Sequence, residues 1–284
     1  MRDQILCSTG AFVGRVNGRD HRIILRTAPL LHCDGLEFMM YEAWYDRWRE
    51  IAADLASSGL SFPVLHADKR IGELFSRNEG EDIREGLRRF AVNCQMAQAL
   101  GAKKLVVHLW GGPPSDRDIA TNIAQLPELS RMSEDAGLLL TVENVVCSHQ
   151  DPLTHLRTLA ERYPRIHFTF DTKMAAFHRQ LEEVYRPEWD WLWSQRRIAH
   201  LHVNDYGGGY MDWSNLRTLH IGDGAIPFDR FFAVLRQKGY HGSYTVEATS
   251  MTGEGILLDK LNGCLEYIRR QLQMDSLTSP ELKV

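Results

Sequence analysis

Six short apolar runs of this sequence end in a histidine or a carboxylate. The residues at these ends are His66, His108, Glu143, Asp171, His202 and Glu247. Neighbouring members of this set are 28 to 45 residues apart, and each interval is about the length of one strand–helix unit. If each run is a strand of one parallel barrel, these side chains meet at its carboxyl end, where such barrels carry their chemistry.

We interpret Glu143, Asp171, His202 and Glu247, which end four consecutive runs, as ligands of one divalent metal ion. Three carboxylates brought together without a cation would repel one another strongly. Oxygen ligands with one nitrogen suit Mn²⁺, Mg²⁺, Co²⁺ or Zn²⁺, and no thiolate favours a softer metal. The alternative is that each residue is an isolated polar strand end in a solvated loop. That alternative is weaker for four residues in register than for one.

Other polar or aromatic side chains near these strand ends are candidate substrate ligands. His66 and His108 could bind substrate, contribute to a second metal site, or be buried structural histidines. The further candidates are Glu37 for a hydroxyl group, Lys173 for an oxygen or phosphate, Arg217 from a covering loop, and Trp110 for a sugar face. A solvated lysine and a tryptophan that only anchors its loop are the alternatives for two of these.

Residues two positions before the proposed ligands lie one layer deeper, because side chains alternate along a strand. These residues are Thr141, Thr169, His200 and Thr245. We predict that they hold the metal ligands by hydrogen bonds from beneath. The alternative is that threonine is simply common in strands.

The alternation of apolar runs with helical segments predicts the fold. The eight runs are 4–8, 35–39, 61–66, 104–108, 138–143, 166–171, 198–203 and 243–247. The segments with helical periodicity include 42–57, 83–100, 118–136, 152–163, 227–238 and 256–274. Eight such units match a (β/α)₈ TIM barrel of the α/β class. A doubly wound sheet is the alternative, although no GxGxxG turn follows the first run. We expect one domain over residues 1–274 and a loose tail over 275–284.

Composition excludes several classes of protein. Of the 284 residues, 44% are hydrophobic and 25% charged, which is unlike a disordered chain. No apolar run reaches the roughly 18 residues that span a membrane. The net charge of −4 argues against a nucleic-acid partner. Five scattered cysteines without a Cys-x-x-Cys pair favour a reducing compartment, so we expect a cytoplasmic protein.

Five stretches carry a family resemblance. They are LGAKKLVVHLWGG (100–112), LLLTVENV (138–145), FTFDT (168–172), HLHVND (200–205) and HIGDGAIPFDRFFAVLRQKGYHGSYTVE (220–247). The last is the most specific, because a GDG turn, a helix and a final strand ending in glutamate follow one another. Together these stretches resemble the xylose isomerase-like TIM barrels, which include sugar isomerases and epimerases, inosose dehydratases and the endonuclease IV group.

The resemblance implies a metal at Glu143, Asp171, His202 and Glu247, with the two glutamates also acting as an acid/base pair. One would remove a proton next to a substrate carbonyl and the other would return one, through an enediolate stabilised by the metal. We therefore expect a sugar isomerase or epimerase acting on a small sugar or polyol, in a fold where homodimers are common. An inosose-type dehydratase on a cyclic polyol is the alternative.

Two further readings are weaker. The endonuclease branch has a histidine at the position of Met174, and an aspartate and a histidine at the positions of Leu216 and Thr218. These departures argue against a trinuclear nuclease. A barrel that binds a sugar or a metal without turnover is the last alternative, and the intact set of four ligands argues against it.

Overall fold

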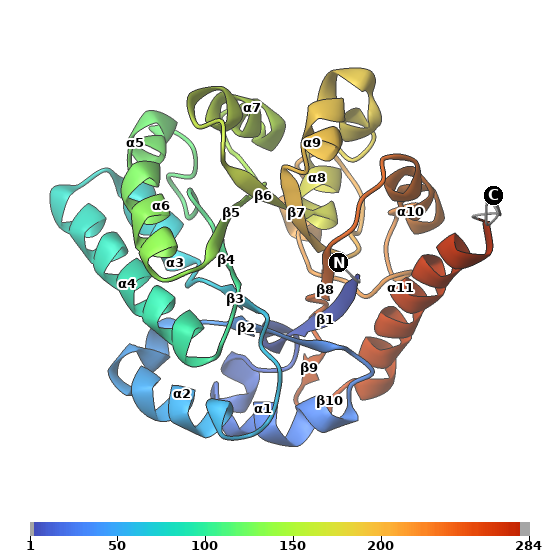
Figure 1. The fold of residues 1–284 in the computed structure, drawn as a ribbon, viewed down its shortest axis with the longest axis horizontal. Helices are drawn as coiled ribbons and strands as arrows, with labels where there is room; N and C mark the ends of the chain where they lie inside the picture. Colours follow the sequence, from blue (N-terminus) through green and yellow to red (C-terminus); the bar gives the residue numbers. More distant parts are fainter. Residues whose placement is uncertain (1–2, 279–284) are drawn as a thin grey trace, which may run out of the picture.

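The computed structural model describes residues 3–278 and confirms the predicted single-domain TIM barrel (Figure 1). Eight parallel strands pair in chain order, and β1 pairs with β8 to close the barrel, which excludes an open doubly wound sheet. The strands are β1 (Gln4–Ser8), β2 (Gly35–Met39), β3 (Val64–His66), β4 (Lys104–Val107), β5 (Leu139–Glu143), β6 (His167–Asp171), β7 (Ile198–His202) and β8 (Ser243–Val246).

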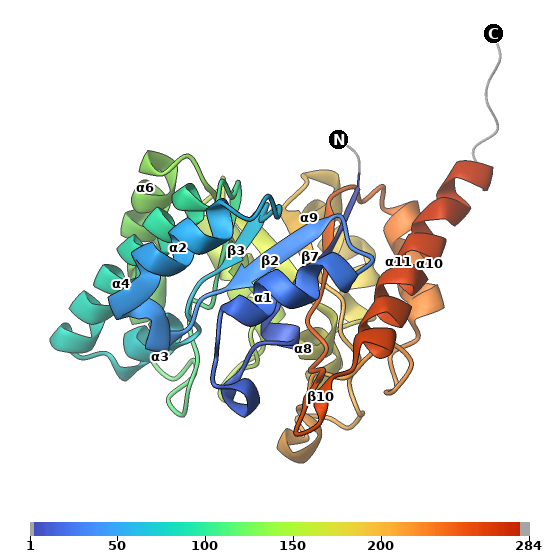
Figure 2. The same ribbon diagram turned by 90° about the horizontal axis from the view of Figure 1, so that it is seen from below.

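Helices cover the outside of the barrel (Figure 1). They are α1 (Arg22–Thr27), α2 (Trp48–Ala56), α3 (Arg70–Arg77), α4 (Gly80–Ala99), α5 (Ile119–Ala124), α6 (Leu126–Asp135), α7 (Pro152–Arg162), α8 (Thr172–Phe177), α9 (Asp190–Ser194), α10 (Phe228–Gln237) and α11 (Leu258–Thr278). After β8, the chain forms a small antiparallel hairpin of β9 (Met251–Thr252) and β10 (Gly255–Ile256). Figure 2 shows this hairpin at one end of the barrel.

Local sequence signals set several element boundaries. Gly101 and Gly137 have positive φ angles of 73° and 70°, and each follows the last turn of a helix. At the start of α7, the Asp151 carboxylate accepts a hydrogen bond from the Thr154 backbone N–H at 2.9 Å, and Pro152 occupies the first helical position. These residues end α4 and α6 and begin α7, and thereby fix where the adjoining loops start.

Two boundaries differ from the prediction near prolines. The run 61–66 becomes a strand only at Val64, because Pro63 has no N–H to donate to a neighbouring strand. The expected helix 118–136 is divided at Gln125 into α5 and α6, and Pro127 lies in the first turn of α6. Proline is therefore tolerated at these positions as the start of an element and not within one.

Other segments differ in length. The expected helix 42–57 begins as a 3₁₀ helix over Glu42–Arg47, before α2. The last helix, α11, continues to Thr278, past residue 275 where the tail was expected to begin, and residues 279–284 lie outside the described part of the chain. No described helix is both long enough and apolar enough to cross a membrane.

The barrel interior changes from apolar to polar along its axis. Leu6, Val64 and Val106 form a small buried cluster that is separate from the large core between strands and helices. His66 and His108 lie two residues beyond Val64 and Val106, and side chains two apart in a strand share a face. An apolar layer therefore closes the barrel beneath the polar residues at the carboxyl ends of the strands.

Candidate metal centre

The structure brings the four predicted ligands together around one nitrogen of His202. The Nδ1 atom of His202 lies 3.5 Å from Glu143 Oε1, 3.5 Å from Glu247 Oε2 and 4.0 Å from Asp171 Oδ2. Asp171 and His202 pair across β6 and β7, while Glu143 ends β5 and Glu247 follows β8. All four residues are buried, and the most accessible, Glu247, is 8% exposed. Four consecutive strands thus contribute one side chain each.

Three buried atoms of this cluster lack a hydrogen-bond partner within residues 3–274. They are Glu143 Oε1, His202 Nδ1 and Glu247 Oε1. Leaving buried acceptors unpaired is costly, and a cation between them would remove that cost. Carboxylate oxygens with one imidazole nitrogen are suitable ligands for Mn²⁺, Mg²⁺, Co²⁺ or Zn²⁺. The buried cluster is therefore consistent with a divalent metal site, and its ligand types leave the metal's identity open.

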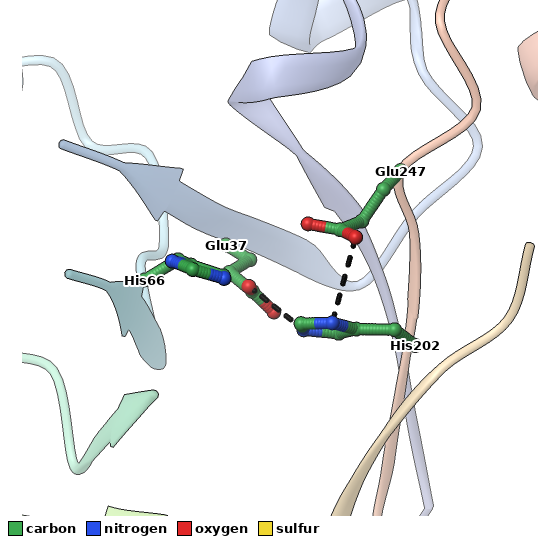
Figure 3. Close-up of side chains that lie close together, drawn as sticks. All are labelled: Glu37, His66, His202 and Glu247. Atoms are coloured by element: carbon green, nitrogen blue, oxygen red, sulfur yellow. Dashed lines mark hydrogen bonds and ion pairs between the residues drawn. The ribbon is translucent and has the colours of Figure 1, made fainter. Parts of the chain in front are cut away.

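Glu37 of β2 orients His202. Glu37 Oε1 accepts a hydrogen bond from His202 Nε2 at 3.0 Å, as Figure 3 shows, with Glu247 near the other nitrogen of the ring. Burial raises the pKa of Glu37, but His202 and His200 outweigh this effect and hold its pKa well below the usual range. An ionised Glu37 requires a proton on Nε2, so a metal would bind His202 through Nδ1. Burial lowers the pKa of His202, but Glu247, Glu37 and Glu143 outweigh this effect and raise its pKa well above the usual value, so a metal at Nδ1 would take the place of a proton.

A chain of hydrogen bonds beneath Glu37 has a defined direction. Burial lowers the pKa of His200 to about 4, so its ring is neutral near pH 7. Its Nε2 lies 2.7 Å from Glu37 Oε2 and must therefore carry the proton. The other ring nitrogen, Nδ1, accepts a hydrogen bond from the Ser243 hydroxyl at 2.6 Å, and Ser243 Oγ accepts one from Lys104 Nζ at 2.7 Å. These hydrogen bonds hold the Glu37 carboxylate in place, and Glu37 in turn holds the ring of His202.

Two histidines occupy one oxygen of Glu143. His66 Nε2 lies 3.1 Å and His108 Nε2 2.9 Å from Glu143 Oε2. Burial lowers the pKa of His108 to about 4. Because both rings approach Oε2, the other oxygen, Oε1, is the one that faces His202 Nδ1. The two histidines therefore orient the Glu143 carboxylate, a role that the sequence analysis did not assign to them.

Asn204 connects two of the proposed ligands, and the sequence analysis missed it. Its Nδ2 lies 3.2 Å from Asp171 Oδ2 and 3.3 Å from Glu247 Oε2, and its Oδ1 accepts a hydrogen bond from the Glu247 backbone N–H at 2.8 Å. Asn204 is two residues after His202, and residues two apart in a strand face the same way. The two-residue spacing from His202 could therefore have placed Asn204 at the site from sequence alone.

A cavity of about 340 Å³ opens beside Glu247 at the carboxyl ends of β1, β2 and β3. Its lining includes Ser8, Met39, Tyr41 and Lys69. The side chain of Lys69 is exposed, and the carboxylates of Glu247, Glu143 and Asp171 outweigh its partial desolvation and raise its pKa above the usual value. Glu247 is thus the predicted ligand that the cavity reaches.

The sequence from residue 29 to residue 267 matches the model of the xylose isomerase-like TIM barrel family. The protein belongs to this family. No match was found among curated proteins.

Several solved structures share the barrel of this xylose isomerase-like protein. D-allulose 3-epimerase from Methylomonas sp., in complex with D-allulose, has a TM-score of 0.69 at 16% identity, covering 95% of this chain and 97% of that chain. A D-tagatose 3-epimerase-like protein has a TM-score of 0.69 at 18% identity, covering 96% of this chain and 98% of that chain. 3-Keto-D-glucoside 4-epimerase from E. coli has a TM-score of 0.64 at 17% identity, covering 95% of this chain and 100% of that chain. At these identities the likeness concerns the fold.

Two predicted substrate ligands of this xylose isomerase-like barrel are buried and do not line the cavity beside Glu247. Trp110 is fully buried and donates a hydrogen bond from Nε1 to the Val145 carbonyl at 3.2 Å, so it anchors its loop. Glu37 is also fully buried, and its oxygens already accept hydrogen bonds from His202, His200 and Thr245. Glu37 is not among the residues that line the cavity beside Glu247.

The remaining predicted substrate ligands, Lys173 and Arg217, differ in burial. Lys173 is buried, donates to Thr218 Oγ1 at 3.0 Å and lies 4.0 Å from Asp171 Oδ2. Arg217 is exposed in the loop after β7, and its neighbour Thr218, rather than Arg217 itself, lines the cavity. Lys173 is therefore near the metal centre, and Arg217 is on the surface.

Thr141, Thr169, His200 and Thr245 were predicted to hold the metal ligands from beneath, and only some of them contact the site. Thr141 and Thr169 hydrogen-bond to each other at 2.7 Å, and neither hydroxyl contacts a proposed ligand in the described part of the chain. The strands are staggered, so that Glu143 pairs with Thr169 rather than with Asp171. His200 and Thr245 do support the site, but they act on Glu37.

Proposed function

We propose that this protein is a divalent-metal-dependent sugar epimerase or isomerase. The convergence of Glu143, Asp171 and Glu247 on His202 Nδ1, next to a cavity large enough for a small sugar, carries this proposal. The similarity in fold to D-allulose 3-epimerase, which was solved with D-allulose, supports a sugar substrate.

In this proposal, Glu143, Asp171, His202 and Glu247 hold the cation. When bound, a divalent cation supplies Lewis-acid polarisation of a substrate carbonyl. His202 binds through Nδ1, because Glu37 engages its Nε2. Asn204 keeps Asp171 and Glu247 adjacent by contacting an oxygen of each.

Glu247 is the proposed group that accepts a proton from the carbon beside the carbonyl. It lines the cavity, and its Oε1 has no hydrogen-bond partner in residues 3–274. Burial raises the pKa values of Glu247 and Glu143, but His202 near Glu247, and His108 and His202 near Glu143, lower both pKa values below the usual range. Both carboxylates are therefore ionised at neutral pH and able to accept a proton. Glu143 is the proposed partner in the second proton transfer.

Deuterium incorporation tests this proton transfer. The Mn²⁺-loaded protein is incubated with ketohexoses, ketopentoses and inososes in D₂O, and deuterium at the carbon next to the carbonyl is measured by NMR. We expect incorporation with the wild type and a loss of about 10²–10⁴-fold in Glu143→Gln and Glu247→Gln. Glu128→Gln removes an exposed carboxylate on α6 and is expected to have no effect.

Three results would contradict the proposal. They are turnover of a substrate without deuterium incorporation, a near-wild-type rate in either active-site variant, and incorporation that does not depend on Mn²⁺. Measuring bound Mn²⁺ in the same samples separates a loss of proton transfer from a loss of metal. Release of water from an inosose would identify a dehydratase instead.

A further inference from the structure

The cavity beside Glu247 carries an excess of positive charge. Its lining contains four cations, Arg15, Arg19, Lys69 and Arg70, together with the carboxylates of Glu42, Asp68 and Glu247. Two of these carboxylates are already neutralised by arginines. Glu42 pairs with Arg70 at 2.6 Å and with Arg89 at 2.8 Å, and Asp68 pairs with Arg89 at 3.1 Å. The third, Glu247, belongs to the proposed metal centre.

Two arginines of the lining have no acidic partner. Arg15 and Arg19 form no ion pair with any carboxylate of residues 3–274, whereas Arg70 in the same lining does. The Nε atom of Arg19 is moreover buried without a hydrogen-bond partner in that range. A buried N–H of a guanidinium is costly to leave unpaired, so a missing acceptor is indicated here. This charge excess occurs in a chain whose net charge is −4.

Arg19 is held in place by an unusual backbone conformation. Its φ angle is +51°, in the left-handed region that non-glycine residues rarely occupy. Its backbone N–H donates to the Gly14 carbonyl at 2.8 Å, and its own carbonyl accepts from Trp44 Nε1 at 2.9 Å. The guanidinium lies over the Tyr41 ring, 5.1 Å from its centre, and the Tyr41 hydroxyl is tied to the Val13 carbonyl at 2.6 Å. Strained residues persist where surrounding contacts fix them, often at ligand-binding positions.

We propose that Arg15 and Arg19 bind an anionic group of the substrate, a phosphate or a carboxylate. Arginine presents several N–H donors in a fork that matches both groups. The cavity also reaches Glu247, so a molecule that fills it places its uncharged end at the metal centre and its anionic end at the two arginines. The inference rests on the proposed function, because it takes the bound molecule to be the substrate of that centre.

Binding of three related probes tests this inference. D-fructose, D-fructuronate and D-fructose 6-phosphate are titrated calorimetrically into the protein with and without Mn²⁺. We expect at least one anionic probe to bind more tightly than D-fructose. Arg15→Gln and Arg19→Gln should each weaken binding of that probe by about tenfold and leave binding of D-fructose unchanged. A preference for the 6-phosphate identifies a phosphate site, and a preference for D-fructuronate identifies a carboxylate site.

Arg22→Gln is the matched control, because Arg22 is an exposed arginine of the neighbouring helix α1 and does not line the cavity. It should behave as the wild type does. The inference is overturned if the wild type binds neither anionic probe more tightly than D-fructose, or if the preference persists in both cavity variants. Should Arg19→Gln fail to fold, Arg15→Gln still tests the anion site, because Arg15 is exposed and its substitution should not disturb folding.

The proposed function and this inference fail in different ways. An anion preference without deuterium exchange on any substrate would overturn the epimerase proposal and leave the anion site standing. Exchange on neutral sugars without an anion preference would overturn the anion site and leave the epimerase proposal standing.

Discussion

At the scale of single residues, Glu37 decides which nitrogen of His202 is free. Its carboxylate engages His202 through one oxygen and His200 through the other. In Glu37→Gln, the amide nitrogen would face one of these two rings as a second donor. We predict that this variant binds Mn²⁺ about 10–100-fold more weakly, as measured by calorimetry.

The control for that prediction is another glutamate that contacts a histidine. Glu266 Oε1 lies 2.6 Å from His32 Nδ1 on the surface, where both side chains are exposed. Glu266→Gln should leave Mn²⁺ affinity unchanged. Equal affinities of Glu37→Gln and wild type would show that Glu37 does not orient a metal ligand.

The convergence of the four candidate ligands was predictable from sequence, and their supporting contacts were not. Ligands at the ends of consecutive strands leave a regular spacing, as Asp171 and His202 do. Glu37 lies 165 residues from His202 in sequence, and its contact with that ring depends on barrel closure and strand stagger. A pattern within one strand carries no information on such a contact, which is why Glu37 was expected to bind substrate.

At the scale of elements, Asp116 joins the loop after β4 to the start of α7. Its carboxylate accepts hydrogen bonds from the backbone N–H groups of residues 148, 149 and 150 at 2.8 to 3.0 Å, and His155 Nε2 lies 2.9 Å from it. Burial raises the pKa of Asp116, but His155 and the backbone donors outweigh this effect and hold its pKa well below the usual range.

We predict that Asp116→Asn lowers the free energy of unfolding by about 1.5–3 kcal/mol at pH 7. Because the pKa of Asp116 is lowered on folding, its stabilisation is present above the unfolded-state pKa of about 3.9 and is lost as pH falls below it. Urea denaturation from pH 7 to pH 3.5 should therefore show the two proteins converging in acid. Asp118→Asn, at an exposed ion pair with Arg117, should change little. A constant difference across this pH range would contradict the account.

The packing of α3 against the loop after β4 depends on Gly72. A Cβ atom at Gly72 would lie 2.5 Å from the His108 carbonyl oxygen and 2.7 Å from that of Trp110. Gly72→Ala should therefore destabilise the protein by about 1–3 kcal/mol, measured by thermal or urea unfolding. The same substitution at Gly263, an exposed position of α11, should be neutral or stabilising, because a Cβ atom there would meet no neighbouring atom within 4 Å. Equal effects of the two substitutions would refute a close contact at Gly72.

Long helices and all eight strands were predictable because their apolar periodicity is strong. The break at Gln125 within 118–136 was missed, since apolar spacing continues across it although the helix does not. The helix α3 was also missed, although Ile71, Leu74 and Phe75 have helical spacing and are buried. Its eight residues are too few for periodicity alone to identify with certainty.

At the scale of the whole molecule, the metal centre depends on the closed barrel. Its proposed ligands come from four neighbouring strands, and Glu37, which orients one of them, comes from β2. The apolar cluster of Leu6, Val64 and Val106 lies beneath the polar layer of the interior. A metal bound here would stabilise the folded barrel, because the unfolded chain does not hold these ligands together.

The stoichiometry of bound Mn²⁺ tests the central claim most directly. Manganese is measured by mass spectrometry after dialysis of the wild type and of Asp171→Asn, a change that keeps a side chain able to cap α8 as Asp171 does through the Met174 N–H. The account predicts one Mn²⁺ per chain in the wild type and a large loss in the variant. Well under one Mn²⁺ per chain in the wild type, or equal amounts in both proteins, would contradict it.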